Sequence, residues 1–172
     1  MSKTKRKTKN NCYKIEKIIY SLTNSTRKKN QLEILDFKYG LTNLCRQHSF
    51  QMAKKNKIWH GKNVFYAKEN VTSPINNVFK DFFSMIPILN WIVYFLFDKG
   101  KSGENVAMMP KGNVKGYKKK IISDYDIANA LHLNWMKSSG HKRNILTKDF
   151  TKIGIGVKRN RNKFYATELF YG

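Results

Sequence analysis

Acidic residues are scarce in this chain of 172 residues: 11 Asp and Glu stand against 34 Lys and Arg, giving a formal net charge of +23. A field of that sign favours anionic partners such as acidic membrane surfaces or nucleic acid. Arginine is scarce as well, with six residues against 28 Lys. Proteins that read bases and phosphates tend to use the Arg fork, so the composition argues against nucleic acid as a specific partner. A codon bias toward Lys and Asn would produce the same excess of lysine.

Cysteine is nearly absent. Cys12 and Cys45 are the only two, and neither belongs to a C-x-x-C pair, which excludes a zinc knuckle or a redox motif of that type. Two free thiols are favoured over a single disulfide, because the chain is not a disulfide-dense scaffold. The segment 1–11 lacks the apolar core of a secretory signal. The sequence therefore predicts a cytoplasmic protein, with peripheral membrane association as an alternative.

No apolar run reaches the roughly 20 residues that span a bilayer. The longest run, 82–97, has 16 residues and contains a proline. Buried packing, an interfacial anchor and a partner-binding patch are alternative interpretations. Lys80 and Lys99 flank the run and would suit an anionic lipid surface. The candidate membrane contacts are Phe82, Phe83, Trp91 and Phe95.

The length and a hydrophobic fraction of 41% suit one domain with a sizeable core. Residues 1–13 are predicted to be a basic flexible arm and 14–172 a domain with a hydrophobic insertion at about 72–101. Apolar periodicity predicts helices, turn signals predict a closing hairpin, and Gly and Pro predict a loop with one short strand. The predicted helices are 14–28, 41–57 and 127–137 with an N-cap at 123–126, the hairpin strands are 153–159 and 163–170, and the loop is 102–116.

Four histidines are available for chemistry. His48 and His132 lie inside predicted helices, and we interpret both as packed or surface residues. His60 and His141 each follow a predicted helix and stand beside a glycine, where a side chain can project into a cleft. Two imidazoles with one or two carboxylates can hold Zn²⁺ while leaving coordination positions open.

The C-terminal third resembles a known family. Residues 135–146 read W-M-K-S-S-G-H-K-R-N-I-L and resemble the W-M-x-S-x-G-H-R-x-N-I-L signature of microbial CAP (SCP-like) domains, the superfamily of cysteine-rich secretory proteins, antigen five and pathogenesis-related one. Residues 150–157 and 164–170 are similar to its F-x-x-I-G-V-G-V and Y-Y-A-T-Q-x-F strands. Further matches are T-N-S-T-R at 23–27 to H-N-x-x-R, H-S-F-Q-M-A at 48–53 with Trp59 and His60 to the second helix and the F-x-H that ends it, and G-E-N-V-A at 103–107 to G-E-N-[IVL]-A.

The resemblance implies an α+β fold, a three-layer α-β-α sandwich with a central, mainly antiparallel sheet. It also implies a cleft with two histidines and two acids. His60 and His141 take the histidine positions, and Glu104 takes the first acid position, with Glu69 as a rival. The second acid position holds Ser138, which argues against paired-carboxylate catalysis. Trp135 and Asn105 complete the candidate cleft residues.

The implied function is a binding domain whose cleft takes a divalent metal such as Zn²⁺, a small apolar or lipid ligand, or both. A metal-assisted, peptidase-like hydrolase using the same cleft is one alternative. A basic surface that binds anionic membrane or nucleic acid is another. Members of the family are often secreted, which conflicts with the cytoplasmic location expected from the N-terminal sequence.

Overall fold

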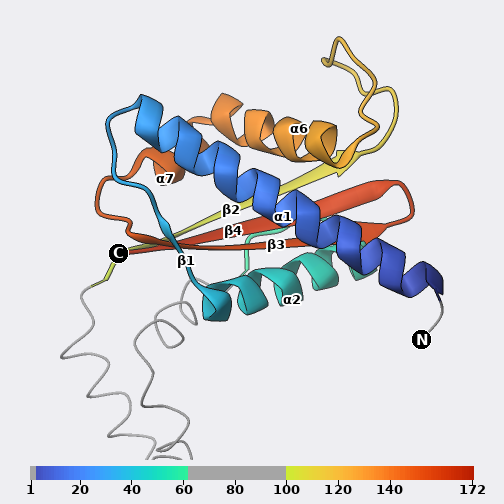
Figure 1. Ribbon diagram of the computed structural model, residues 1–172, viewed down its shortest axis with the longest axis horizontal. Helices are drawn as coiled ribbons and strands as arrows, with labels where there is room; N and C mark the ends of the chain where they lie inside the picture. The colour runs from blue at the N-terminus through green and yellow to red at the C-terminus, as the bar shows by residue number, and fades with distance from the viewer. Residues whose placement is uncertain (1–2, 62–99) are drawn as a thin grey trace, which may run out of the picture.

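The computed structural model describes the backbone of residues 3–61 and 100–172, and the side chains from Cys12 onward within these ranges. Helix α1 (Lys3–Lys29) runs diagonally across the molecule (Figure 1). It begins well before the predicted boundary at residue 14, so most of the segment predicted to be an arm is helical. No Gly or Pro occurs in the first 29 residues, so no helix breaker separates this segment from the amphipathic part that follows.

Within the described residues, a four-stranded sheet forms the middle layer, with strand order β1-β3-β4-β2. The β3–β4 and β4–β2 pairs are antiparallel, and β1 pairs with β3 in parallel. The tight turn between β3 and β4 places Arg161 in the left-handed region, with φ of 52°. The strands are β1 (Asp36–Phe37), β2 (Ser102–Pro110), β3 (Lys152–Asn160) and β4 (Lys163–Tyr171).

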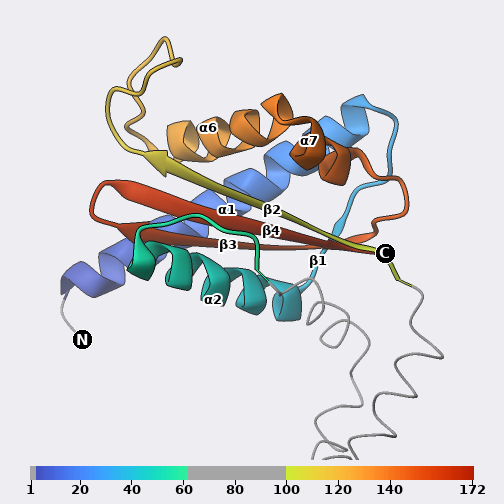
Figure 2. The same cartoon turned by 180° about the vertical axis from the view of Figure 1, so that it is seen from behind.

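Helices cover both faces of the sheet. Helix α2 lies on one face, and α1, α6 and α7 lie on the other (Figures 1 and 2). The architecture is the predicted α+β sandwich with a mainly antiparallel sheet. The bounds are α2 (Tyr39–Lys55), α6 (Asp124–Lys137) and α7 (Ser139–Leu146).

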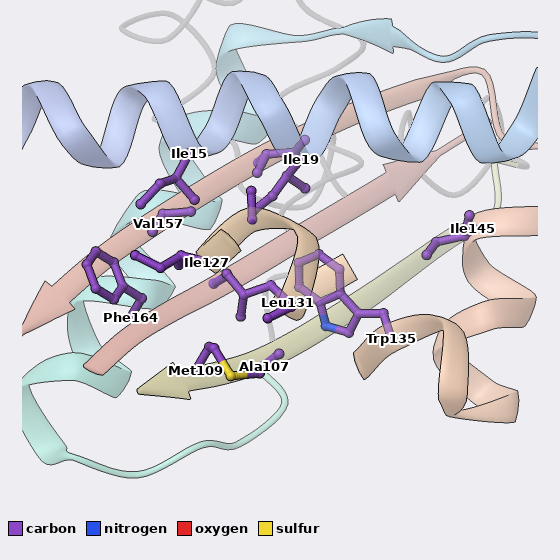
Figure 3. Close-up of a cluster of buried hydrophobic side chains, with 14 of the residues drawn as sticks. Ile15, Ile19, Ala107, Met109, Ile127, Leu131, Trp135, Ile145, Val157 and Phe164 are labelled. Atoms are coloured by element: carbon purple, nitrogen blue, oxygen red, sulfur yellow. The ribbon is translucent and has the colours of Figure 1, made fainter. Parts of the chain in front are cut away.

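The main hydrophobic core fills the space between the sheet and the α1–α6 layer (Figure 3). Ile15 and Ile19 of α1 meet Leu131 and Trp135 of α6 there, and all four side chains are fully buried. On the opposite face, α2 packs directly on the two glycines of β3. A Cβ added at Gly156 would lie 2.2 Å from backbone atoms of α2, so the glycine pattern permits this close approach.

Two elements differ from the sequence-based predictions. The segment predicted as loop with one short strand contains the full nine-residue strand β2, which pairs with β4 along its whole length. Ser138 does end α6, as predicted, but a second helix, α7, starts at once. The predicted N-cap is confirmed, because Ser123 and Asp126 form a reciprocal capping box at the start of α6.

Both cysteines are free thiols, as predicted. Within the described residues, no helix is long and apolar enough to cross a membrane. Several predictions fall outside the described ranges: the rival acid Glu69, nearly all of the insertion at 72–101, and the membrane contacts Phe82, Phe83, Trp91 and Phe95.

Candidate functional site

Glu104 is the centre of the candidate site. It lies near the start of β2, and only 6% of the residue is exposed. Its Oε2 atom lies 3.1 Å from Nδ1 of His60 and accepts a 2.9 Å hydrogen bond from the backbone N–H of Gly61. Glu104 therefore fixes the segment that follows α2 and holds the imidazole of His60, whose side chain is largely exposed.

A second imidazole approaches Glu104 from α2. Nδ1 of His48 lies 3.0 Å from Oε1 of Glu104, and both side chains are almost completely buried. The distance allows a hydrogen bond, but the alignment does not. Within the described part of the chain, both ring nitrogens of His48 and Oε1 of Glu104 have no hydrogen-bond partner. Trp59 packs edge-on against the His48 ring at 5.6 Å.

His141 brings the third imidazole to the site. It stands in the first turn of α7, and its ring centroid lies 5.8 Å from that of His60. Partial burial and the nearby His60 lower the pKa of His141, while Glu104 acts in the opposite direction. The lowered pKa favours the neutral form of His141, the form in which imidazole ligates metals.

A buried polar network connects α7 to the sheet. The side-chain amide of Asn105 donates to the backbone carbonyl of His141 at 3.2 Å and to Oε2 of Glu168 at 3.1 Å. Asn144 donates to Asn105 Oδ1 and to the backbone carbonyl of Glu104. This network fixes the backbone of His141 relative to the strand that carries Glu104.

Arg27 holds α7 from the side of α1. Its guanidinium is fully buried and donates to the backbone carbonyls of Ile145, Thr147 and Phe150. These carbonyls lie at the end of α7 and just beyond it, where a helix leaves acceptors unsatisfied. The arginine at the end of the T-N-S-T-R segment thus anchors the helix that carries His141.

The structure brings together three of the residues that the sequence singled out, His60, Glu104 and His141. Asn105 lies beside them, in the supporting network. Ser138 is the residue that joins α6 to α7, and its side chain makes no capping hydrogen bond.

Trp135 and His48 have surroundings that the sequence did not reveal, whereas His132 is a packed residue, as interpreted from the sequence. Trp135 belongs to the main core and is fully buried, so it is not a wall of an open cleft. His132 is buried, bonded to Thr26 at 2.8 Å, and burial lowers its pKa to about 4. His48 was interpreted as a packed or surface residue, but its contact is Glu104. Its one-face spacing with Leu44 and Cys45 could not show that a strand 56 residues away supplies a carboxylate.

Comparison with known proteins agrees with this architecture. The model of the cysteine-rich secretory protein family (CAP) matches residues 20–171, and the chain therefore belongs to the CAP family.

Two solved structures are similar over most of the chain. An outer surface protein from Borrelia burgdorferi is 19% identical with a TM-score of 0.56, and the match covers 92% of both chains. An extracellular SCP-domain protein from Bacillus anthracis str. Ames is 22% identical with a TM-score of 0.53, over 99% of this chain and 43% of that one. These likenesses support the fold. No curated protein matches the chain.

The donor set fits a metal only in a limited way. Within the described residues, no group of three or more His, Cys, Asp or Glu side chains is arranged to hold a metal ion. Glu104 is hydrogen-bonded to His60 and Gly61. It is therefore suited to orienting a candidate metal ligand, His60, more than to binding a metal directly. Of the three imidazoles, His48 is buried against Glu104, so His60 and His141 remain, and a site built on these two requires water for its other positions.

Proposed function

We propose that this CAP domain binds a divalent metal ion, Zn²⁺ in the first place, between His60 and His141. The observation that supports this most is the contact between Nδ1 of His60 and Glu104. A carboxylate that accepts from one ring nitrogen fixes the tautomer and leaves the other nitrogen unprotonated, the arrangement found behind metal-bound histidines. Nε2 of His60 is then the metal-binding atom.

The separation of the two rings is compatible with shared ligation. A Zn–N bond of about 2.0–2.1 Å places each ring centroid roughly 3.2 Å from the metal. Two such rings at a roughly tetrahedral angle have centroids about 5–6 Å apart, and the observed value is 5.8 Å. When bound, the metal supplies an open, polarising coordination position that takes water or an acceptor group of a ligand.

Binding is favoured over hydrolysis by the surroundings of the two histidines. Ser138 stands where relatives with a second acid would carry it, so Glu104 is the one carboxylate beside the rings in the described chain, and it is buried and engaged. General acid–base chemistry needs a group that can move a proton to or from the substrate. The small apolar or lipid ligand that the resemblance implies for the same cleft stays a prediction.

Calorimetric titration with ZnCl₂ tests the proposal. The double variant His60→Ala/His141→Ala is expected to lose the binding event of the wild type. His132→Gln is the matched control, because it removes a buried imidazole outside the site and keeps a side chain able to bond Thr26. Equal affinity in the double variant and the wild type would refute the assignment.

A second observation favours an additional role on another surface. The loop between β2 and α6 forms a hollow of about 330 Å³ lined by four lysines, with no acidic side chain in the lining. A two-way backbone pairing between Gly112 and Ile121 closes its base, and the hydroxyl of Tyr117 donates to the carbonyl of Ala130 on α6. We propose that this loop binds the phosphates of an anionic membrane surface. The lining residues are Asn113, Val114, Lys115, Tyr117, Lys118, Lys119 and Lys120.

Vesicle flotation separates this local site from the general charge of the protein. The triple variant Lys118→Gln/Lys119→Gln/Lys120→Gln should lose most binding to phosphatidylglycerol-containing vesicles, and binding should weaken with salt. The control, with Lys28, Lys54 and Lys57 changed to Gln, removes the same charge from other exposed positions and should bind nearly as the wild type. Equal losses in the two triple variants would show that net charge alone drives binding.

A further inference from the structure

The least explained group in the described chain is His48. It is 5% exposed, and neither of its ring nitrogens has a hydrogen-bond partner there. Oε1 of Glu104 lies 3.0 Å from its Nδ1, and within residues 12–61 and 100–172 that oxygen is equally without a hydrogen bond. Two unpaired polar groups at this distance inside a protein are costly, because each has lost its water.

The two oxygens of the Glu104 carboxylate differ in their hydrogen bonding. Oε2 is satisfied by His60 and Gly61, whereas among the described residues the close polar contact of Oε1 is His48. The carboxylate is thus held from one side only, by the two contacts of Oε2, and the unpaired oxygen would gain from a rotation that brings it to another donor. Any such rotation would withdraw Oε2 from His60, since both oxygens belong to one planar group.

We propose that His48 is a positioning residue of the cleft. Its Nδ1–H donates to Oε1, holds the carboxylate plane of Glu104, and thereby keeps Oε2 directed at Nδ1 of His60. The orientation of an imidazole about its χ2 angle is soft, so a small ring rotation converts the 3.0 Å contact into an aligned hydrogen bond. With the ring of His60 held in this way, its Nε2 atom is available to the metal. The expected effect on metal affinity rests on the proposed function.

These contacts explain why His48 is buried on α2, a helix that otherwise packs apolar and small side chains against the sheet. Met52 and Ala53 of α2, for example, are buried in a hydrophobic cluster with Val106 and Tyr165. A histidine kept only for packing against Trp59 would not need a nitrogen at 3.0 Å from a carboxylate. Phenylalanine would serve that packing equally well, which makes His48→Phe the informative substitution.

Nitrogen-15 NMR of the histidine rings in the metal-free protein tests the inference without reference to metal binding. In the wild type, Nδ1 of both His48 and His60 should carry the proton. In His48→Phe, His60 should shift toward the Nε2–H form that free histidine favours. His48→Gln places an amide donor near Oε1 and should restore the wild-type tautomer of His60 in part. His132→Gln should leave it unchanged.

The possible results distinguish the positioning role of His48 from the proposed binding of Zn²⁺. An unprotonated Nδ1 on His48 in the wild type overturns the positioning role, even if no variant folds. An unchanged His60 tautomer in folded His48→Phe overturns it as well. In calorimetry, His48→Phe should weaken Zn²⁺ binding about tenfold, the lower end of the range for groups behind a metal ligand. A tautomer shift in a protein that binds no Zn²⁺ would refute the proposed function and leave the positioning role standing.

Discussion

Glu168 makes the free energy of unfolding depend on pH, and both the sign and the size of this dependence can be predicted. This residue of β4 is fully buried, and it accepts hydrogen bonds from Thr23 Oγ1 at 2.8 Å and from Asn105 Nδ2 at 3.1 Å. Burial nevertheless dominates and raises the pKa of Glu168 from its ordinary value of 4.5 to about 7. The folded protein therefore keeps a proton that the unfolded chain has already lost at pH 6.

The sign and size follow from that difference. Below pH 4.5 Glu168 is protonated in both states and adds no pH dependence. Between pH 4.5 and 7 the folded state binds more protons, so the free energy of unfolding falls as pH rises, and the loss levels off above pH 7. One pKa unit corresponds to about 1.4 kcal/mol, so the full loss is roughly 3 kcal/mol.

Glu168→Gln isolates this contribution, because glutamine cannot ionise and has nearly the same shape. Its carbonyl can accept from Asn105 while its amide donates to the hydroxyl of Thr23, which can act as acceptor. The family strand that this segment resembles has Gln at the same position. Denaturant unfolding at pH 5 should show a small difference between variant and wild type, and at pH 8 the variant should be more stable by roughly 3 kcal/mol. A difference that is constant with pH would refute the reasoning.

Further predictions concern two contacts that position the helices of the site: the packing of α2 on Gly156 and the hydrogen bonds from Arg27 to the end of α7. Gly156→Ala should lower the free energy of unfolding by about 2–3 kcal/mol, as overpacking does, because the new methyl group would meet the backbone of α2. Gly140→Ala, where nothing lies within 4 Å, is its control in denaturant unfolding and should not lower stability, because alanine is favoured over glycine in a helix such as α7. Arg27→Lys should cost about 2 kcal/mol or more, because an ammonium cannot reach all the carbonyls that the guanidinium fork reaches. Amide hydrogen exchange should then be faster in α7, and unchanged protection there would contradict the anchoring role.

Sequence reasoning was strongest where the signal was local. Alternating Ile and Gly in β3 predicted both a strand and the close approach of another element, and α2 supplies that element. The N-cap at Ser123 could be predicted for the same reason, since the partners of its capping box lie three residues apart.

The sequence was less informative where burial or distant partners decide the structure. Strand β2 is buried along most of its length, so it lacks the alternation that marks a half-exposed strand, and its Gly and Pro favoured a loop. Ser139 and Gly140 read as the end of a helix, although α7 contains both. His48 and Glu104 meet only because α2 packs under the sheet, a contact that helical spacing alone does not encode.

Diffraction from crystals grown with ZnCl₂, with data collected at the zinc absorption edge, tests the central claim most directly. We expect an anomalous peak about 2.0–2.1 Å from Nε2 of His60 and from one ring nitrogen of His141, with Glu104 still bonded to Nδ1 of His60. A peak bound directly by Glu104 in place of His60, or zinc only at sites away from these two rings, would contradict it.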